Sequence, residues 1–206
     1  MPLSTNQRSL WLFLVTGLLV QVITFCLMPH SPWALVSGML GICSVVLGAQ
    51  GNILTFVFGF AQVVSYTYLC VVERFYAEIA INIYYFFTMI YGVYCWRRRL
   101  SGKSLQVQTR SLSRGVFLLL SIVTVLLSIL SGWLLQRYTD DPQPYLDAFT
   151  TMPAIVAQIL MVMTYREQWY LVMWLRAENY CMVAQYAFWC ANCIYGYVQW
   201  TKSLQE

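Results

Sequence analysis

The chain has 206 residues, of which 60% are hydrophobic and only 10% are charged, and its formal net charge is +4. A soluble domain carries about 25% charged residues, so this composition excludes an ordinary soluble fold. We therefore predict an integral membrane protein, in which lipid covers much of the surface.

Apolar runs of membrane-spanning length follow one another along the chain. A helix needs roughly 20 residues to cross a hydrocarbon layer about 30 Å thick. The first run follows Arg8 and is too long for the core of a signal peptide, which indicates an uncleaved helix. By length and hydropathy the sequence predicts all-α structure, with helices over 9–28, 33–49, 52–72, 75–96, 115–136, 147–164 and 179–200.

A further helix is expected between 164 and 179, but its apolar stretch runs only from Trp169 to Leu175. Seven residues extend about 10 Å as a helix, a third of the distance needed. We therefore expect a shortened seventh helix.

A seven-residue signature occurs once in each half of the chain. It reads IYGVYCW over 90–96 and IYGYVQW over 194–200, with an offset of 104 residues. Repeated units of this kind are typical of small-solute transporters, whose site lies between the repeats. The spacing from the preceding turn is 40 residues for Gly51 to Tyr91 but 28 for Glu167 to Tyr195, so the second copy is short by roughly a dozen residues near 172–174. A natural deletion, a half-helix that enters the bundle and residues missing from the sequence are three open explanations.

The distribution of positive charge predicts the orientation. Residues 97–114 carry six Lys or Arg and no acid, which is typical of a cytoplasmic segment. With eight crossings, both termini are then cytoplasmic, and nine basic residues lie inside against three outside. The same segment could bind nucleic acid or anionic lipid, but the topology already accounts for its charge.

The polar residues within the predicted spans are uncharged. All eight acidic residues lie in loops or close to helix ends, whereas ion-coupled carriers generally hold a carboxylate near the membrane midplane. This pattern favours passive movement of a neutral or weakly cationic solute. The buried amides are Gln62, Asn82, Gln158, Gln185 and Asn192.

Two predicted helices repeat one arrangement of aromatic and polar residues. Asn82 and Tyr85 lie on the same face as Gly92 and Trp96, and 104 residues later Tyr186 and Trp189 precede Gly196 and Trp200 in the same way. An aromatic ring beside an amide is suited to a flat heterocycle. We predict that Gln62, Asn82, Tyr85, Tyr186 and Trp189 bind the substrate, with Gln185 and Asn192 beside them. The glycines and the final tryptophans form a structural signature, through close helix approach and placement at the membrane boundary.

No motif for hydrolysis, phosphoryl transfer or nucleotide binding is present, so we predict that the protein is not an enzyme. Cys190 and Cys193 lack the further ligands that a metal site needs. We expect neither a metal nor a cofactor.

The motif Asn82-x-x-Tyr85-x₆-Gly92-x₃-Trp96 resembles the signature of the PnuC family of bacterial vitamin transporters. The likeness extends from about Trp33 to Trp200 and is strongest to the nicotinamide riboside branch. The family also has a WxxN-type site along the seventh helix, which implies a binding role for Trp169. Here Trp174 also remains, but no asparagine follows until Asn179.

The resemblance implies a SWEET-like 3+1+3 arrangement, in which two three-helix bundles flank a connector helix. The expected parts are an extra N-terminal helix at 1–30, a first repeat at 31–96, a linker and connector at 97–144 and a second repeat at 145–206. It further implies a homotrimer in the bacterial inner membrane, with no nucleic-acid or stable protein partner.

By the same resemblance, the function is uniport of nicotinamide riboside for NAD synthesis. Thiamine, riboflavin or a deoxynucleoside is an alternative cargo. The short seventh helix leaves a second class open, a membrane scaffold or sensor without transport.

Overall fold

The computed structural model describes residues 5–27, 31–74, 76–100, 105–172 and 180–204, and these contain eight helices. The predicted helices are confirmed, with ends that differ by a few residues. The bounds are α1 Thr5–Leu27, α2 Pro32–Ala49, α3 Thr55–Val72, α4 Tyr76–Arg97, α5 Arg114–Tyr138, α6 Pro144–Val162, α7 Gln168–Val172 and α8 Tyr180–Lys202.

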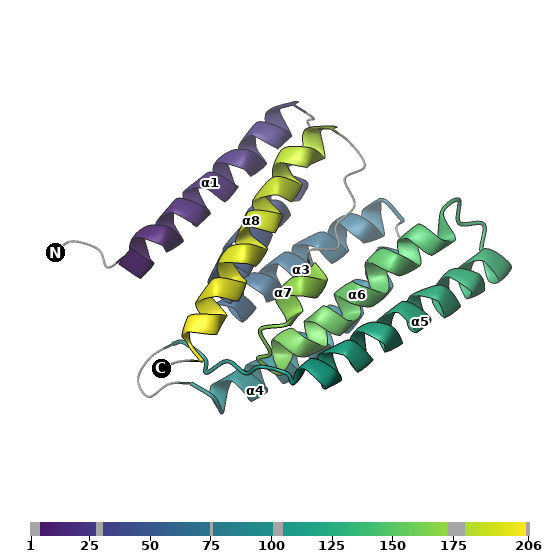
Figure 1. The fold of residues 1–206 in the computed structure, drawn as a ribbon. Helices are drawn as coiled ribbons and strands as arrows, with labels where there is room; N and C mark the ends of the chain where they lie inside the picture. The colour runs from purple at the N-terminus through teal and green to yellow at the C-terminus, as the bar shows by residue number, and fades with distance from the viewer. Residues whose placement is uncertain (1–4, 28–30, 75, 101–104, 173–179, 205–206) are drawn as a thin grey trace.

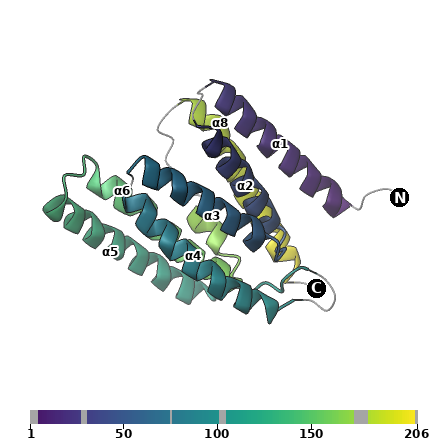
Figure 2. The same ribbon diagram turned by 180° about the vertical axis from the view of Figure 1, so that it is seen from behind.

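Six helices form a closed ring. α3 packs between α2 and α4, α4 also contacts α6, and α7 packs between α6 and α8, which in turn contacts α2. The remaining two helices lie outside this ring. α1 packs against α2 and α8, and α5 packs along α6 and also touches α7 through the rings of Phe117 and Tyr170 (Figures 1 and 2).

Helices α1 to α6 are long and apolar enough to cross a membrane. α8 has 23 residues but is richer in amides and aromatics, and it is not among these six. α7 is described over five residues, Gln168–Val172, and the expected shortening of the seventh helix stays a prediction. The predicted stretch from 173 to 175 lies outside the described residues.

The turns after α2 and α6 have the same backbone structure. Gly51 and Thr164 both adopt a left-handed conformation, with φ of 66° and 65°. Gly51 N donates to Gly48 O at 2.9 Å, and Thr164 N donates to Met161 O at 3.0 Å. The two turns are therefore corresponding parts of a duplicated unit, 113 residues apart.

This correspondence corrects the estimated shortening of the second copy. Gly51 precedes Trp96 by 45 residues, whereas Thr164 precedes Trp200 by 36. The difference is nine residues rather than about a dozen, because the turn that matches Gly51 is centred on Thr164 and not on Glu167.

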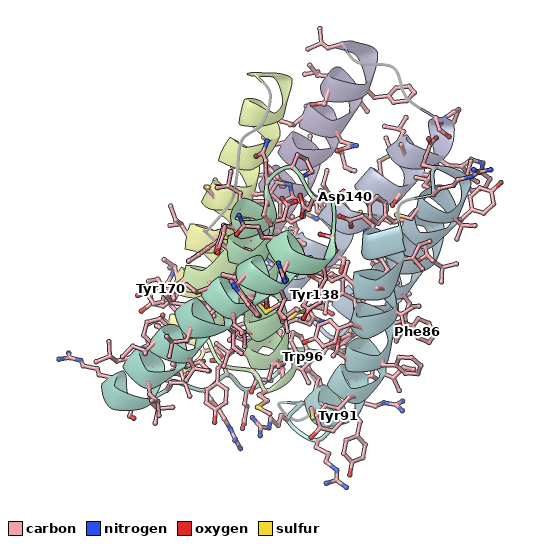
Figure 3. All side chains as sticks on the ribbon, turned by 90° about the vertical axis from the view of Figure 1, so that its right-hand side faces the viewer. Phe86, Tyr91, Trp96, Tyr138, Asp140 and Tyr170 are labelled. Carbon is pink, nitrogen blue, oxygen red and sulfur yellow. The ribbon has the colours of Figure 1, made fainter. Side chains whose placement is uncertain are left out.

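Trp96 and Trp200 tie the two halves together across the ring. The indole N–H of Trp96 donates to Met161 O at 3.0 Å, and that of Trp200 donates to Gly48 O at 3.1 Å. The rings are 0% and 1% exposed and lie 5.8 Å apart between centroids. Both side chains therefore lie in the protein interior, and Figure 3 shows Trp96 inside the bundle.

The two signature glycines make room for aromatic rings. A Cβ at Gly92 would lie 2.6 Å from the Phe56 ring, and one at Gly196 would lie 2.5 Å from the Trp169 ring. Phe56 and Trp169 are themselves 113 residues apart, so each repeat packs the first turn of its second helix against the glycine of its third.

We expect Gly196→Ala to lower the free energy of unfolding by about 1–3 kcal/mol, because the added methyl group overpacks a closed contact with Trp169. Thermal or denaturant unfolding in detergent measures the change. Gly115→Ala is the matched control, since a Cβ there meets nothing within 4 Å. An equal loss for both variants would contradict the packing argument.

The segment that joins the two halves is tied to both matched turns. Val107 N donates to Gly51 O at 2.9 Å, and Arg110 N donates to Thr164 O at 2.7 Å. The Thr109 hydroxyl donates to Trp200 O at 2.7 Å. Residues 105–110 thus form a strap across one end of the ring.

Aromatic side chains on the outer faces point away from the bundle. Figure 3 shows Phe86 and Tyr91 projecting from α4, whereas Trp96 on the same helix lies inside. Such an apolar outer surface is what lipid contact requires.

Candidate functional site

The ring encloses a cavity of about 920 Å³, within the range of small-molecule sites. All six ring helices contribute to its wall, with Gln21 added from α1. The polar side chains of the wall are Gln21, Ser37, Ser44, Thr55, Gln62, Tyr66, Tyr85, Asp147, Thr150, Gln158, Gln168, Trp169 and Trp189.

α2 and α6 line the cavity with corresponding faces. Each contributes residues spaced three and four apart over 14 positions, so the cavity follows these helices for about 21 Å. The corresponding positions, 113 residues apart, are Ala34 and Asp147, Ser37 and Thr150, Gly41 and Ala154, Ser44 and Ala157, Val45 and Gln158, and Gly48 and Met161.

This pairing shows where the two walls differ chemically. Opposite Ala34 and Val45 of the first repeat, the second repeat places Asp147 and Gln158. The remaining pairs are small or weakly polar except for Met161. The second repeat therefore supplies the acidic side chain of the described wall and two of its four amides.

We call the end of the cavity at the first turns of α2 and α6 the mouth, because Ala34 and Asp147 there are partly exposed, and the end at α7 the floor, because Gln168 and Trp169 there are buried. Asp147 lies in the first turn of α6, at the end away from the linker, and marks the mouth. Gln168 and Trp169 begin α7 beside the matched turns and mark the floor. Tyr85 and Trp189 lie midway along α4 and α8.

Four of the predicted binding residues are brought together. Gln62, Tyr85, Trp169 and Trp189 all line this cavity. Tyr85 and Trp189 come from corresponding positions of the two repeats, 104 residues apart, so the cavity has one large aromatic ring from each half at the same depth. Trp169 also packs edge-on to Trp200, at 6.0 Å between ring centroids.

The other predicted residues are placed differently. Asn82 is buried but lies outside the cavity wall, and its Nδ2 donates to Glu78 O at 2.7 Å. The side chains of Gln185 and Tyr186 lie outside the described residues. Asn192 is 0% exposed and also lies outside the wall.

The duplication explains the surroundings of Asn192. Between α6 and α4, Gln158 Nε2 donates to Thr88 Oγ1 at 3.3 Å. The corresponding residues between α2 and α8 are Val45 and Asn192, and valine offers no hydrogen-bonding atom. Both polar atoms of the Asn192 amide accordingly lack a partner among the described residues.

Sequence reasoning missed Asp147, Gln168 and Thr150 as wall residues. Asp147 was grouped with the acids in loops and close to helix ends, and Gln168 was not singled out. Adding 113 to the positions of the small residues on one face of α2 gives the corresponding positions of α6, and this would have identified Asp147 and Thr150. That offset could not be read from the signature, whose copies are 104 residues apart.

The described part of the wall carries one acidic side chain and neither lysine nor arginine. Glu78, in the first turn of α4, lies within electrostatic range of Asp147. The mouth is therefore suited to a cation. Within the described ranges no three metal-ligating side chains cluster, so we assign no metal there.

A ring of apolar helices around a largely uncharged cavity defines a multi-pass membrane protein that can carry a small solute. Comparison with known proteins gives the family. Residues 31–202 match the model of the nicotinamide mononucleotide transporter family. The chain belongs to this family, and the resemblance to PnuC proteins is confirmed by the relatives below.

Two curated relatives are similar along almost the whole chain. The nicotinamide riboside transporter PnuC of Haemophilus influenzae is 30% identical, over 95% of this chain and 90% of the relative. That of Neisseria mucosa is 28% identical, over 98% of this chain and 83% of the relative. A crystal structure of the vitamin B3 transporter PnuC matches with a TM-score of 0.76 and 26% identity, over 99% of this chain and 94% of that one.

Proposed function

We propose that this protein carries nicotinamide riboside across the membrane by facilitated diffusion. The observation that carries the proposal is the chemistry of the cavity wall, where Tyr85 and Trp189 face a space lined by uncharged amides and by Asp147. Aromatic rings stack on a flat pyridinium ring and attract its positive charge, and amides bind a carboxamide and ribose hydroxyls. The names of both curated relatives agree with this substrate.

The wall favours the riboside over the mononucleotide that the family description names. A phosphate group carries about two negative charges, and proteins bind it with lysine, arginine or helix N-termini. The described wall offers a carboxylate and no cationic side chain. A phosphorylated substrate would meet repulsion from Asp147 at the mouth.

The proposed mechanism is uniport. The acidic residue of the described wall, Asp147, lies in the first turn of α6 and not at mid-depth. A coupling carboxylate is expected near the midplane, where ion binding and substrate binding can be linked. Accumulation would then depend on consumption of the riboside in the cytoplasm for NAD synthesis.

Uptake by proteoliposomes tests substrate and mechanism together. Radiolabelled nicotinamide riboside should equilibrate saturably without any gradient. Because the substrate is a cation, a potassium diffusion potential of 100 mV, negative inside, should raise the internal concentration about 50-fold. Proton or sodium gradients at zero potential should have no effect.

Two results would contradict the proposal. Absence of saturable uptake would exclude nicotinamide riboside as the substrate and favour the scaffold alternative. Accumulation driven by a pH or sodium gradient alone would exclude uniport. Competition by thiamine, riboflavin and a deoxynucleoside identifies another cargo, and Asp147 favours the cationic thiamine among these three.

The finer architecture is also part of this proposal. The ring order supports two bundles, α2–α4 and α6–α8, with α5 as connector and α1 as the extra helix. The strap lies at the end of the ring where Arg97, Arg98 and Arg99 also lie, which supports a cytoplasmic placement of that end. The domain bounds, the bacterial inner membrane and the homotrimer stay predictions.

A further inference from the structure

The floor of the cavity contains two hydrogen-bond donors without partners. Gln168 Nε2 and Trp169 Nε1 make no hydrogen bond among the described residues, although the side chains are only 4% and 5% exposed. Both residues line the cavity. An unpaired buried donor costs free energy, so it points to a group that is absent from the empty cavity.

The first repeat shows how such a position is normally satisfied. Thr55, which corresponds to Gln168, donates its hydroxyl to Ser44 O at 2.7 Å. Ser44 in turn donates to Thr55 O at 2.9 Å, so α2 and α3 are joined by a reciprocal pair. The polar atoms at this point of the first repeat are used up within the protein.

The second repeat cannot form this pair. The residue that corresponds to Ser44 is Ala157, which has no polar side chain. Gln168 is longer than threonine and lines the same cavity. Where the first repeat has the hydrogen-bonded pair Ser44 and Thr55, the second repeat therefore has a hydrogen-bond donor, Gln168 Nε2, at the cavity floor.

We propose that Gln168, with the indole N–H of Trp169, anchors the carboxamide oxygen of the substrate. This inference rests on the proposed function. The aromatic rings of Tyr85 and Trp189 lie above the floor and Asp147 lies at the mouth. The ring of the substrate then stacks at mid-depth, its carboxamide points to the floor, and its ribose points to the hydroxyl-lined mouth.

The test compares two ligands on the full-length protein in detergent by calorimetry. The ligands are nicotinamide riboside and the pyridinium riboside that lacks the carboxamide. Gln168→Leu removes the donor and keeps the approximate volume. It should weaken nicotinamide riboside binding about tenfold and leave the affinity for the second ligand unchanged.

Stability provides an independent measurement. Because Gln168→Leu removes a buried Nε2 donor that has no partner among the described residues, the melting temperature of the ligand-free protein should not fall. Thr109→Val is the matched control, since the Thr109 hydroxyl donates to Trp200 O at 2.7 Å within the protein and Thr109 lies outside the cavity wall. It should lower the melting temperature and keep the affinity for nicotinamide riboside within about twofold.

The outcomes distinguish a failure of the proposed Gln168 anchor from a failure of the proposed transport function. If the wild-type protein binds nicotinamide riboside and Gln168→Leu binds both ligands as before, the anchor is wrong and the function stands. Equal weakening for both ligands also overturns the anchor, because the loss would not depend on the carboxamide. If the wild-type protein does not bind nicotinamide riboside, the proposed function fails, and the anchor fails with it.

Discussion

Replacing Trp200 by alanine should lower the free energy of unfolding by about 3–5 kcal/mol, the range for truncating a fully buried aromatic side chain. Trp200 contacts the rings of Trp96 and Trp169 and donates a hydrogen bond to Gly48 O. Its removal would open a cavity where the two repeats meet and take one hydrogen bond from that carbonyl, which still accepts from Gly51 N. Reversible unfolding in mixed micelles measures the change.

Two controls separate the effect of burial from the effect of the indole N–H. Trp133 lies on α5 and is 51% exposed, so Trp133→Ala should have an effect below about 1 kcal/mol. Trp200→Phe keeps an aromatic ring but removes the N–H. Its free energy of unfolding should lie between those of Trp200→Ala and the wild type. If Trp200→Ala and Trp133→Ala destabilise equally, the cross-repeat contact does not hold the ring together.

Replacing Asp147 by lysine should abolish saturable uptake of nicotinamide riboside, and Asp147→Asn should weaken binding about tenfold. The reason is Coulombic, since a carboxylate about 10 Å from a pyridinium contributes roughly 1–2 kcal/mol at an effective dielectric constant near 20, before the cost of desolvation. Initial uptake rates across a range of substrate concentrations give the KM for each variant.

The duplication supplies a control for position. Ala34 corresponds to Asp147 on the opposite wall of the cavity. In the double variant Asp147→Ala/Ala34→Asp, the negative charge stays at the mouth but changes walls, and part of the affinity should return. Asp140→Asn, in the exposed loop after α5 (Figure 3), should leave the KM unchanged. An unchanged KM for Asp147→Asn would contradict the role of the charge.

Much of the fold could be predicted because its determinants are local. Hydropathy over some 20 residues gave the helices, and the signature around Gly92 and Gly196 revealed the duplication. The structural roles of Trp96 and Trp200 stay a prediction, and their burial in the protein interior could not be predicted from the sequence. A membrane boundary and a protein interior both favour tryptophan, so composition alone does not separate them.

The site was only partly predictable. Tyr85 and Trp189 were found because the 104-residue offset relates them directly. Asp147 and Gln168 were missed because they correspond to residues of the first repeat that lie 113 positions earlier, whereas the signature shows only the offset of 104. Asn192 was predicted to bind, yet it lies outside the wall, because helical periodicity gives a face to within about a quarter turn and not a contact.

The sequence by itself determined that this is a duplicated helical membrane protein with a positively charged linker and mostly uncharged polar groups inside. Only the tertiary structure decided which of those groups share one cavity and which donors have lost their partners. The physical reason is that the deciding pairs, α2 with α8 and α4 with α6, are distant in the chain. Likewise, the alanine at 157, where the first repeat has Ser44, affects a residue of another helix, Gln168.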